Sequence, residues 1–256
     1  MTGDVWDDPR TAAAYRRFCA RHDRYRRVAA ALADALDLPT RRRVLEVGAG
    51  TGVTSRALLR DLPTGAVVDA VEPAGAMRAA STLRDRRLRW HAEIPDGRYD
   101  AVVCSAALWL LGPLPDALDR LLASLAPDGV LGFTVPSAYL GLPDGDPGDR
   151  PGALDGLLAA FLEGRTRAPE PAPAPPDHAA LAAALRAAGR SPTVTEVRVR
   201  WTLATQEDWL RLPPVGLALR PDLAPETLDA TVDAAVAAVG RRRGHRTERW
   251  TVWTAT

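Results

Sequence analysis

The stretch Val44-Leu-Glu-Val-Gly-Ala-Gly-Thr-Gly52 joins a continuous apolar run to three glycines at alternate positions. The apolar run predicts a strand buried on both faces. The glycines predict a tight turn into a helix, where backbone N–H groups approach a ligand closely. The spacing is G-x-G-x-G, because Val53 occupies the place of the third glycine of the dinucleotide fingerprint. Glu46 stands two residues before the first glycine, so a cationic ligand suits this loop better than a phosphate.

The residues around this loop alternate short apolar runs with helical stretches. We expect strands at 44–47, 66–71, 88–91, 101–105 and 130–135, with helices near 53–62, 74–86 and 115–126. This order is typical of a parallel sheet with crossover helices. The sequence therefore predicts an α/β core over residues 40–136.

The flanking segments differ from the core in pattern and composition. Apolar residues recur every three or four positions over residues 10–38, which predicts a helix. Beyond the core we expect loops at 141–151 and 168–176, a helix over 177–188, a strand over 193–203, a helix opened by a capping box at 205–208, a helix after Pro225 and a last strand over 249–254. The apolar positions of the strand over 193–203 change parity after Val194, which indicates either a bulge or a late start of the strand. We divide the chain into N-terminal lid helices at 1–39, the core at 40–136 and the remaining sheet with cap insertions at 137–256, all within one domain.

Composition excludes several kinds of chemistry. The 256 residues contain 33 basic and 32 acidic side chains, and every basic one is arginine. Without lysine or asparagine the chain cannot form a lysine Schiff base, a P-loop lysine site or a Cys-His-Asn triad. The net charge of +1 argues against a nucleic-acid partner, and two cysteines alone, Cys19 and Cys104, do not make a closed zinc site, so we expect no metal. Residues 1–10 lack the apolar core of a signal peptide and no run is long enough to span a membrane, so we expect a cytoplasmic protein without a membrane partner.

A second acidic residue, Glu72, ends the next apolar run about twenty residues past the glycine loop, where a carboxylate accepts hydrogen bonds from ribose hydroxyls. The two acids describe a site for a positively charged nucleoside without phosphates. With these motifs the chain resembles the class I methyltransferases that use S-adenosylmethionine (SAM), of the small-molecule type that includes ubiquinone- and biotin-pathway enzymes. Residues 101–105 and 125–130 match the family's fourth strand and the turn into its fifth. The resemblance covers residues 40–136 well and the remainder in outline.

The resemblance implies a Rossmann-like seven-stranded mixed sheet whose last strand is antiparallel, with N-terminal lid helices and a C-terminal helical cap. It also implies SAM as the cofactor, with Glu46 at its amino group and Glu72 on its ribose. The other residues that it implies at the cofactor are Tyr15 and Tyr25 from the lid, Gly48, Ala49, Gly50 and Gly52 in the loop, Pro73 after Glu72, Met77 against the adenine, and Cys104 in the fourth strand.

The chain departs from the family pattern after the third strand. The family usually has an Asp before Ala there, and the Asp meets the adenine amino group. Here His91 precedes Ala92. With this change, the resemblance implies that the backbone of Ala92 contacts the adenine ring and that His91 or Glu93 makes the polar contact. The alternative is a solvent-facing His91 at the end of a strand.

The acceptor is less sharply indicated than the cofactor. Residues 104–109 lack the Asn/Asp-Pro-Pro-Tyr/Phe motif of amide and exocyclic-amine methyltransferases, which argues against nucleobase or protein-glutamine acceptors. Trp109 follows the fourth strand at a substrate-lining position, and Trp201 and Trp209 lie in the stretch expected to cap the pocket; each has the alternative of a core position. An aromatic lining suits a flat or apolar acceptor. His22, on the apolar face of the lid helix, is the candidate general base, and its alternative is a hydrogen-bonded histidine at a helix–sheet contact.

Three functions remain open at this point. The first is methyl transfer to oxygen, nitrogen or carbon of a small metabolite, in specialised metabolism. The second is carboxyl methylation of a carrier-bound acyl chain, which requires a basic rim of arginines. The third is a SAM-binding cyclase or non-catalytic subunit of the same fold. The sequence also leaves a homodimer open.

Overall fold

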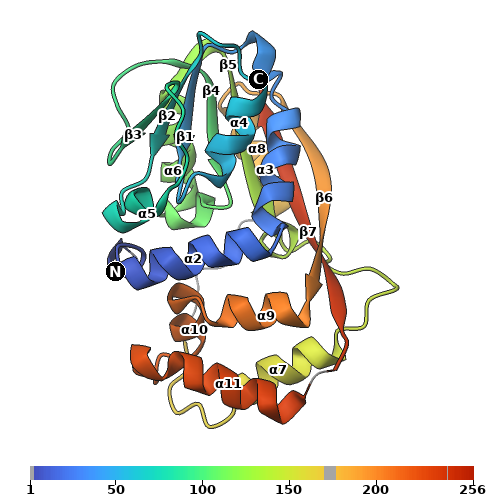
Figure 1. The fold of residues 1–256 in the computed structure, drawn as a ribbon. Helices are drawn as coiled ribbons and strands as arrows, with labels where there is room; N and C mark the ends of the chain where they lie inside the picture. The colour runs from blue at the N-terminus through green and yellow to red at the C-terminus, as the bar shows by residue number, and fades with distance from the viewer. Residues whose placement is uncertain (1–2, 170–176, 241) are drawn as a thin grey trace.

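A computed structural model describes residues 3–169, 177–240 and 242–256, and its framework is a seven-stranded sheet (Figure 1). The strands are β1 (Arg43–Val47), β2 (Val67–Val71), β3 (Leu88–His91), β4 (Tyr99–Ser105), β5 (Leu125–Pro136), β6 (Pro192–Thr202) and β7 (His245–Ala255). Their order in the sheet is β3-β2-β1-β4-β5-β7-β6. β7 runs antiparallel to both of its neighbours, and the pairs among β1 to β5 are parallel. The predicted Rossmann-like mixed sheet is therefore confirmed.

Helices cover both faces of the sheet, because strands with continuous apolar runs must be buried on both sides. On one face lie α3 (Arg24–Asp34) and α4 (Val53–Asp61), and on the other lie α6 (Leu114–Ala123) and α8 (His178–Ala187). The first core includes Leu32, Leu58, Val68 and Val103, and the second includes Leu121, Leu185, Val102, Phe133 and Trp253.

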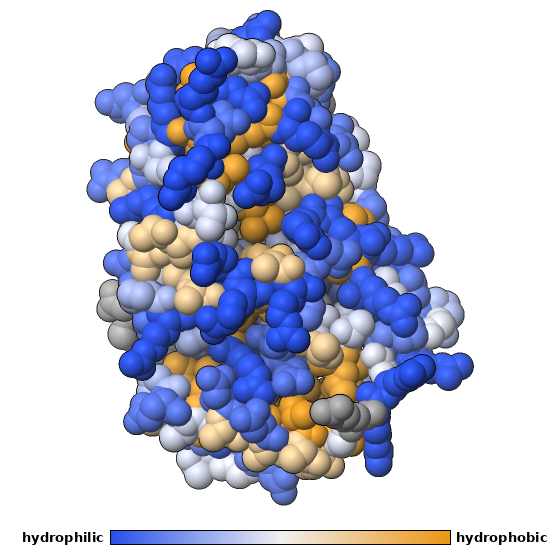
Figure 2. Space-filling model, in the orientation of Figure 1, coloured by the Kyte–Doolittle hydropathy of each residue, from blue (hydrophilic) through white to orange (hydrophobic). Residues whose placement is uncertain are grey.

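A second layer of helices forms a cap below the sheet in Figure 1. It consists of α7 (Gly152–Leu162), α9 (Leu203–Leu210), α10 (Pro213–Leu219) and α11 (Leu228–Val239), with a core of its own around Leu157, Phe161, Leu210, Leu228 and Val232. The lid helix α2 (Pro9–Arg21), preceded by α1 (Gly3–Trp6), lies between the sheet and the cap. In Figure 2 a hydrophilic band crosses the molecule at about the level of α2, and more hydrophobic surface lies below it, over the cap.

The cap is joined to the sheet near one residue. β6 and β7 pair without interruption from Pro192 with Ala255 to Thr202 with His245. α9 follows Thr202 directly, and the chain returns from α11 at His245. Arg150, just before α7, makes an isolated bridge to the same His245. Both segments of the cap therefore begin or end beside His245.

The predicted helix over 10–38 is wrong in its continuity. α2 ends at Arg21, His22 is extended with φ −118° and ψ 138°, and α3 begins at Arg24. The apolar stripe continues through the break, but its two halves are buried on different partners. α2 packs toward α5 (Gly75–Ala80), whereas α3 packs on α4 and the sheet.

Two expectations for β6 and the helix after it are also wrong. Val194 marks neither a bulge nor a late start, since the register with β7 is continuous and β6 already begins at Pro192. The change of parity arises because Val194 packs into the core that contains α8, whereas Val199 packs on the opposite face with Val28 of α3. The following helix starts at Leu203 rather than at the capping box, because the side chain of Thr202 accepts the capping hydrogen bond from the N–H of Thr205.

Elsewhere the helices differ in length from the prediction. The helix expected over 74–86 stops at Ala80, and the chain runs without regular structure to a turn at 85–88, where the Asp85 carboxylate accepts from the backbone N–H of Arg87 at 2.9 Å. α7 and α10 were not predicted, and residues 170–176 of the predicted loop 168–176 lie outside the described residues. Short 3₁₀ helices also occur: η1 (Leu38–Thr40), η2 (Leu108–Leu110), η3 (Ser137–Leu140) and η4 (Pro225–Thr227). Within the described ranges, none of the helices has both the length and the apolar character needed to cross a bilayer.

Candidate active site

The glycine loop between β1 and α4 has a backbone that favours glycine at all three positions. The φ angle is 77° at Gly48, 56° at Gly50 and 89° at Gly52. A Cβ added to Gly48 would lie 2.5 Å from the Cβ of Ala107, in the segment after β4. The loop is therefore pressed against the end of β4, at the carboxyl edge of the parallel strands where α/β sheets bind ligands.

Glu46 is a buried carboxyl at the base of this loop, with 1% of its surface exposed. Its Oε2 accepts a hydrogen bond from Ser55 Oγ at 2.5 Å. Burial raises the pKa of Glu46 to about 8, although the hydrogen bond from Ser55 opposes this shift. Among the described residues, no arginine or histidine pairs with Glu46. A cation bound here would supply the missing positive charge.

Glu72 ties the glycine loop to α5. Its Oε2 accepts from the N–H of Gly50 at 2.8 Å, and its Oε1 accepts from the N–H of Ala74 at 3.0 Å, across the turn at Pro73. Burial raises the pKa of Glu72. Met77 of α5 is buried, and its methyl group lies 3.6 Å from the position of a Cβ on Gly50. Each carboxylate oxygen keeps a further lone pair for another donor, such as a hydroxyl.

The lid brings aromatic rings onto the loop. Tyr15 of α2 places its Cε1 3.7 Å from the position of a Cβ on Gly50. The ring of Tyr25, at the start of α3, lies 5.5 Å from that of Tyr15. Burial is the main cause that raises the pKa of both tyrosines. The structure thus brings Tyr15 against the loop, with Tyr25 one ring further away.

His91 turns back along the sheet instead of facing the solvent. Its Nε2 lies 2.8 Å from Asp69 Oδ1 of β2, and the hydroxyl of Tyr99 donates to the other oxygen of Asp69 at 3.2 Å. One ring nitrogen is therefore already occupied. Ala92 and Glu93 are exposed at the end of β3, and the backbone carbonyl of His91 accepts from the N–H of Glu72.

His22 lies between the lid and the cap. Its Nε2 is 2.7 Å from Asp208 Oδ2 and its Nδ1 is 3.3 Å from Thr205 Oγ1, both on α9. The expectation that His22 faces the pocket as a general base is wrong, because both ring nitrogens are taken by side chains of the cap. The alternative, a hydrogen-bonded histidine at a helix–sheet contact, agrees with these hydrogen bonds. The partner, however, is the cap helix α9 and not the sheet.

Of the three candidate tryptophans, only Trp109 lies near the end of β4. Trp201 is 1% exposed, donates from Nε1 to Gln206 Oε1 at 2.7 Å, and meets the ring of Trp209 edge-on at 5.6 Å. Trp201 is packed at the junction of β6 and α9, so its prediction as a pocket lining is wrong. Trp209 is half-buried and packs in a cluster with Phe18 and Leu212, between lid and cap, and its role at the pocket stays a prediction. Cys104 of β4 is fully buried in the apolar core, and burial raises the pKa of its thiol to about 12.

Sequence reasoning missed a buried ion pair beside the lid. The guanidinium of Arg24 donates to both carboxylate oxygens of Glu248, at 2.7 and 2.6 Å. Its Cζ also lies 4.6, 4.8 and 4.9 Å from the ring centroids of Tyr25, Trp201 and Trp250. The two charged residues are separated by 224 positions in the sequence. The alternation of apolar and polar residues along β7 was the only sequence signal that could have indicated a buried Glu248.

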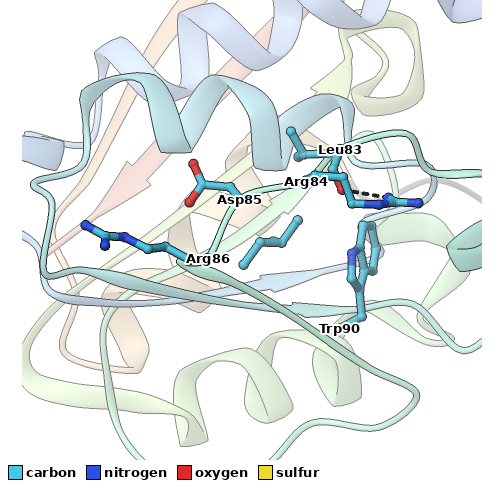
Figure 3. Close-up of a pocket in the computed structure, with 6 residues that line it drawn as sticks. Leu83, Arg84, Asp85, Arg86 and Trp90 are labelled. Carbon is cyan, nitrogen blue, oxygen red and sulfur yellow. Dashed lines mark hydrogen bonds between the residues drawn. The ribbon is translucent and has the colours of Figure 1, made fainter.

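Two hollows lie outside the glycine loop. Figure 3 shows the first, about 580 Å³, where Trp90 of β3 points toward Leu83 and Arg84, while Asp85 and Arg86 lie on the other side. The second is a groove of about 640 Å³ between α2 and the cap. The side chains that line it include arginines and acids from both walls: Arg10, Arg17, Arg21, Asp208, Arg211, Glu226, Asp229 and Asp233.

Comparison with known proteins gives matches along much of the chain. A family model described as a methyltransferase domain matches residues 20–189. The biotin biosynthesis bifunctional protein BioCD of Bordetella avium is 39% identical over 136 residues, which are 47% of this chain and 29% of that protein. A malonyl-[acyl-carrier protein] O-methyltransferase of Magnetococcus marinus is 38% identical over 107 residues, which are 38% of this chain and 39% of that protein. The matches thus span well under half the length of both relatives.

A solved structure agrees in fold over most of the chain. It is a SAM-dependent methyltransferase from Geobacter sulfurreducens in complex with S-adenosyl-L-homocysteine, and it aligns with a TM-score of 0.52 at 18% identity. The alignment covers 89% of both chains.

Proposed function

The chain belongs to the methyltransferase domain family, and from this premise we propose that it transfers a methyl group from SAM to a small-molecule acceptor. The observation that carries the proposal is Glu46, a buried carboxyl at the glycine loop that has a hydroxyl partner but no cationic partner among the described residues. An uncompensated buried carboxyl is costly to ionise. A cationic cofactor would compensate the charge of the ionised Glu46 carboxylate.

The residues present fit SAM in their chemistry. Glu46 would compensate positive charge at the methionine end, Glu72 would accept from ribose hydroxyls with its remaining lone pairs, and Met77 would offer an apolar surface to the base. SAM, when bound, supplies a methyl group activated by its sulfonium. The chain itself contributes position and exclusion of water, since Tyr15 covers the loop and Ala107 closes it from the side.

A binding experiment tests the cofactor assignment. Titration calorimetry with S-adenosylhomocysteine should give at least a tenfold weaker affinity for Glu72→Ala than for the wild type, because the hydroxyl acceptors are lost. Glu163→Ala removes an exposed carboxylate at the end of α7 and serves as the matched control. Equal affinities for all three proteins would refute the assignment.

A transfer experiment tests the activity. SAM with a tritiated methyl group should label acceptors in a panel of small metabolites, and S-adenosylhomocysteine should accumulate with the labelled product. Cofactor binding without transfer to any acceptor would instead favour the cyclase or non-catalytic subunit.

A specific observation favours a second candidate, carboxyl methylation of a carrier-bound acyl chain. Three arginines of α2, Arg10, Arg17 and Arg21, line one wall of the groove between lid and cap, whose other wall carries acids, and Arg21 pairs with Asp208 across it. A relative is named as a malonyl-[acyl-carrier protein] O-methyltransferase. Arginines suit an acidic carrier or its phosphate-linked arm. Methylation of malonyl-carrier protein but not of free malonate, and its loss in Arg17→Ala, would select this candidate.

A further inference from the structure

The indole N–H of Trp250 differs in its hydrogen bonding from those of the other deeply buried tryptophans. Trp201 and Trp253, like Trp250, are at most 1% exposed. Trp201 donates to Gln206 at 2.7 Å, and Trp253 donates to Thr251 Oγ1 at 2.9 Å. Trp250 Nε1 finds no acceptor within the part of the chain that the structure describes. A buried tryptophan usually has a partner for this group, so the exception requires a reason.

A second orphaned donor lies directly after β5, at the start of η3. Ser137 is 1% exposed, and among the described residues its Oγ also has no hydrogen-bond partner. The register of β5 and β7 pairs Trp250 with Pro136, the residue directly before Ser137. Two buried polar groups are therefore left without partners at the same end of neighbouring strands. Such groups are costly when they remain unpaired, and a bound ligand is one way to satisfy them.

The surroundings of these donors are aromatic. The ring of Trp250 lies 6.3 Å from that of Tyr25 and 6.3 Å from that of Trp109. Tyr139 in η3 lies 5.7 Å from Trp109. Rings at these separations pack on one another and form an aromatic wall, and the guanidinium Cζ of Arg24 lies 4.9 Å from the centroid of Trp250.

Two routes connect this aromatic cluster to the glycine loop. The first runs through Tyr25 to Tyr15, which lies against Gly50. The second runs through Ala107, which closes on Gly48, and its neighbour Ala106, which packs against the cluster. Ala106 has φ 54°, a left-handed conformation that is costly for a residue other than glycine and that is concentrated at functional sites.

The cluster also has a side that faces solvent. Trp109 and Tyr139 are half-buried, and Leu110 beside Trp109 is 42% exposed, among the most exposed large apolar side chains of the described residues. The cluster therefore borders solvent on the side of η2.

We propose that Trp250 and Ser137 are the hydrogen-bond donors of the acceptor site, and that the acceptor is a flat aromatic molecule carrying an oxygen that accepts from them. The inference rests on the proposed function, because it places this acceptor beside the SAM loop. It narrows the substrate from any small metabolite to oxygenated aromatic compounds.

The test follows the NMR signal of the Trp250 indole N–H. In a ¹H–¹⁵N spectrum of the full chain with S-adenosylhomocysteine, the Trp250 indole resonance is identified as the one missing from Trp250→Phe. Addition of 7-hydroxycoumarin, a flat molecule with carbonyl and hydroxyl oxygens, should shift this resonance. Naphthalene lacks the oxygen and decahydro-2-naphthol is not flat, so both should bind at least fivefold more weakly than 7-hydroxycoumarin.

Variants separate recognition from structure. Trp250→Phe keeps a ring but removes the donor, and it should weaken 7-hydroxycoumarin about fivefold to tenfold while S-adenosylhomocysteine binds unchanged. Trp253→Phe, on the opposite face of β7, is the matched control and should leave the probe affinity unchanged. An unmoved Trp250 resonance, or equal probe affinity in Trp250→Phe and the wild type, overturns the acceptor site alone. Failure of the wild type to bind S-adenosylhomocysteine overturns the proposed function.

Discussion

Replacement of Glu46 by glutamine should stabilise the ligand-free protein, and by an amount that depends on pH. Burial raises the pKa of this carboxyl from its ordinary value of 4.5 to about 8. Between these values the unfolded chain is ionised at this position while the folded chain keeps the proton. The wild type therefore loses stability as pH rises from about 4.5 to about 8, and the loss is complete above about 8.

The size of the effect follows from the two pKa values. Each pH unit in this window costs about 1.4 kcal/mol. Glu46→Gln, which cannot ionise, should match the wild type near pH 5 apart from a constant offset. It should be more stable by about 3 kcal/mol at pH 7 and by about 5 kcal/mol at pH 9, as upper limits.

Urea denaturation of both proteins at pH 5, 7 and 9 measures this difference directly. Groups that do not interact with Glu46 titrate in both proteins and cancel in the comparison, whereas Glu72, whose charge helps to raise the pKa of Glu46, does not. With S-adenosylhomocysteine bound, the wild type should be more stable than Glu46→Gln, because the ligand's ammonium group favours the ionised carboxylate. The affinity of the wild type for this ligand should rise with pH up to about 8. A stability difference that stays constant from pH 5 to 9 would refute the view of Glu46 as an uncompensated buried acid.

Three further substitutions probe other parts of the structure. Glu248→Gln should lower the free energy of unfolding by about 3–5 kcal/mol, because it leaves Arg24 buried without its partner; a loss below about 1 kcal/mol in urea melts would contradict this. Gly48→Ala should abolish cofactor binding in calorimetry and lower the melting temperature, since its Cβ would meet that of Ala107 at 2.5 Å; retained affinity would show that the loop can shift. Ser137→Ala should leave stability in thermal melts unchanged or slightly higher, because the hydroxyl has no partner in the described ranges of the chain, and a large loss would reveal a structural partner.

The core and the cofactor loop were predictable because their signals are local. Buried parallel strands appear as continuous apolar runs, and the glycines with Glu46 and Glu72 lie within a short stretch of chain. The break at His22 was not predictable, because the apolar stripe continues through it and the choice of burial partner is made by distant elements. The pairing of His22 with Asp208 and the gathering of aromatic side chains around Trp250 depend on contacts between residues far apart in the sequence.

The bridge at His245 has a consequence for how this protein can diversify. Thr202 and His245 face each other across the ribbon of β6 and β7, so the segment 203–244 leaves and rejoins the framework at one junction, beside which the α7 segment also begins at Arg150. Insertions, deletions or exchanges in residues 203–244 therefore change the cap without altering the order of the strands. The glycine loop is not independent of this segment, because Val53 directly after the loop packs in one cluster with Leu212 and Val215. The strand framework can thus stay fixed while the cap is remodelled, provided that an apolar side chain still fills the position of Leu212.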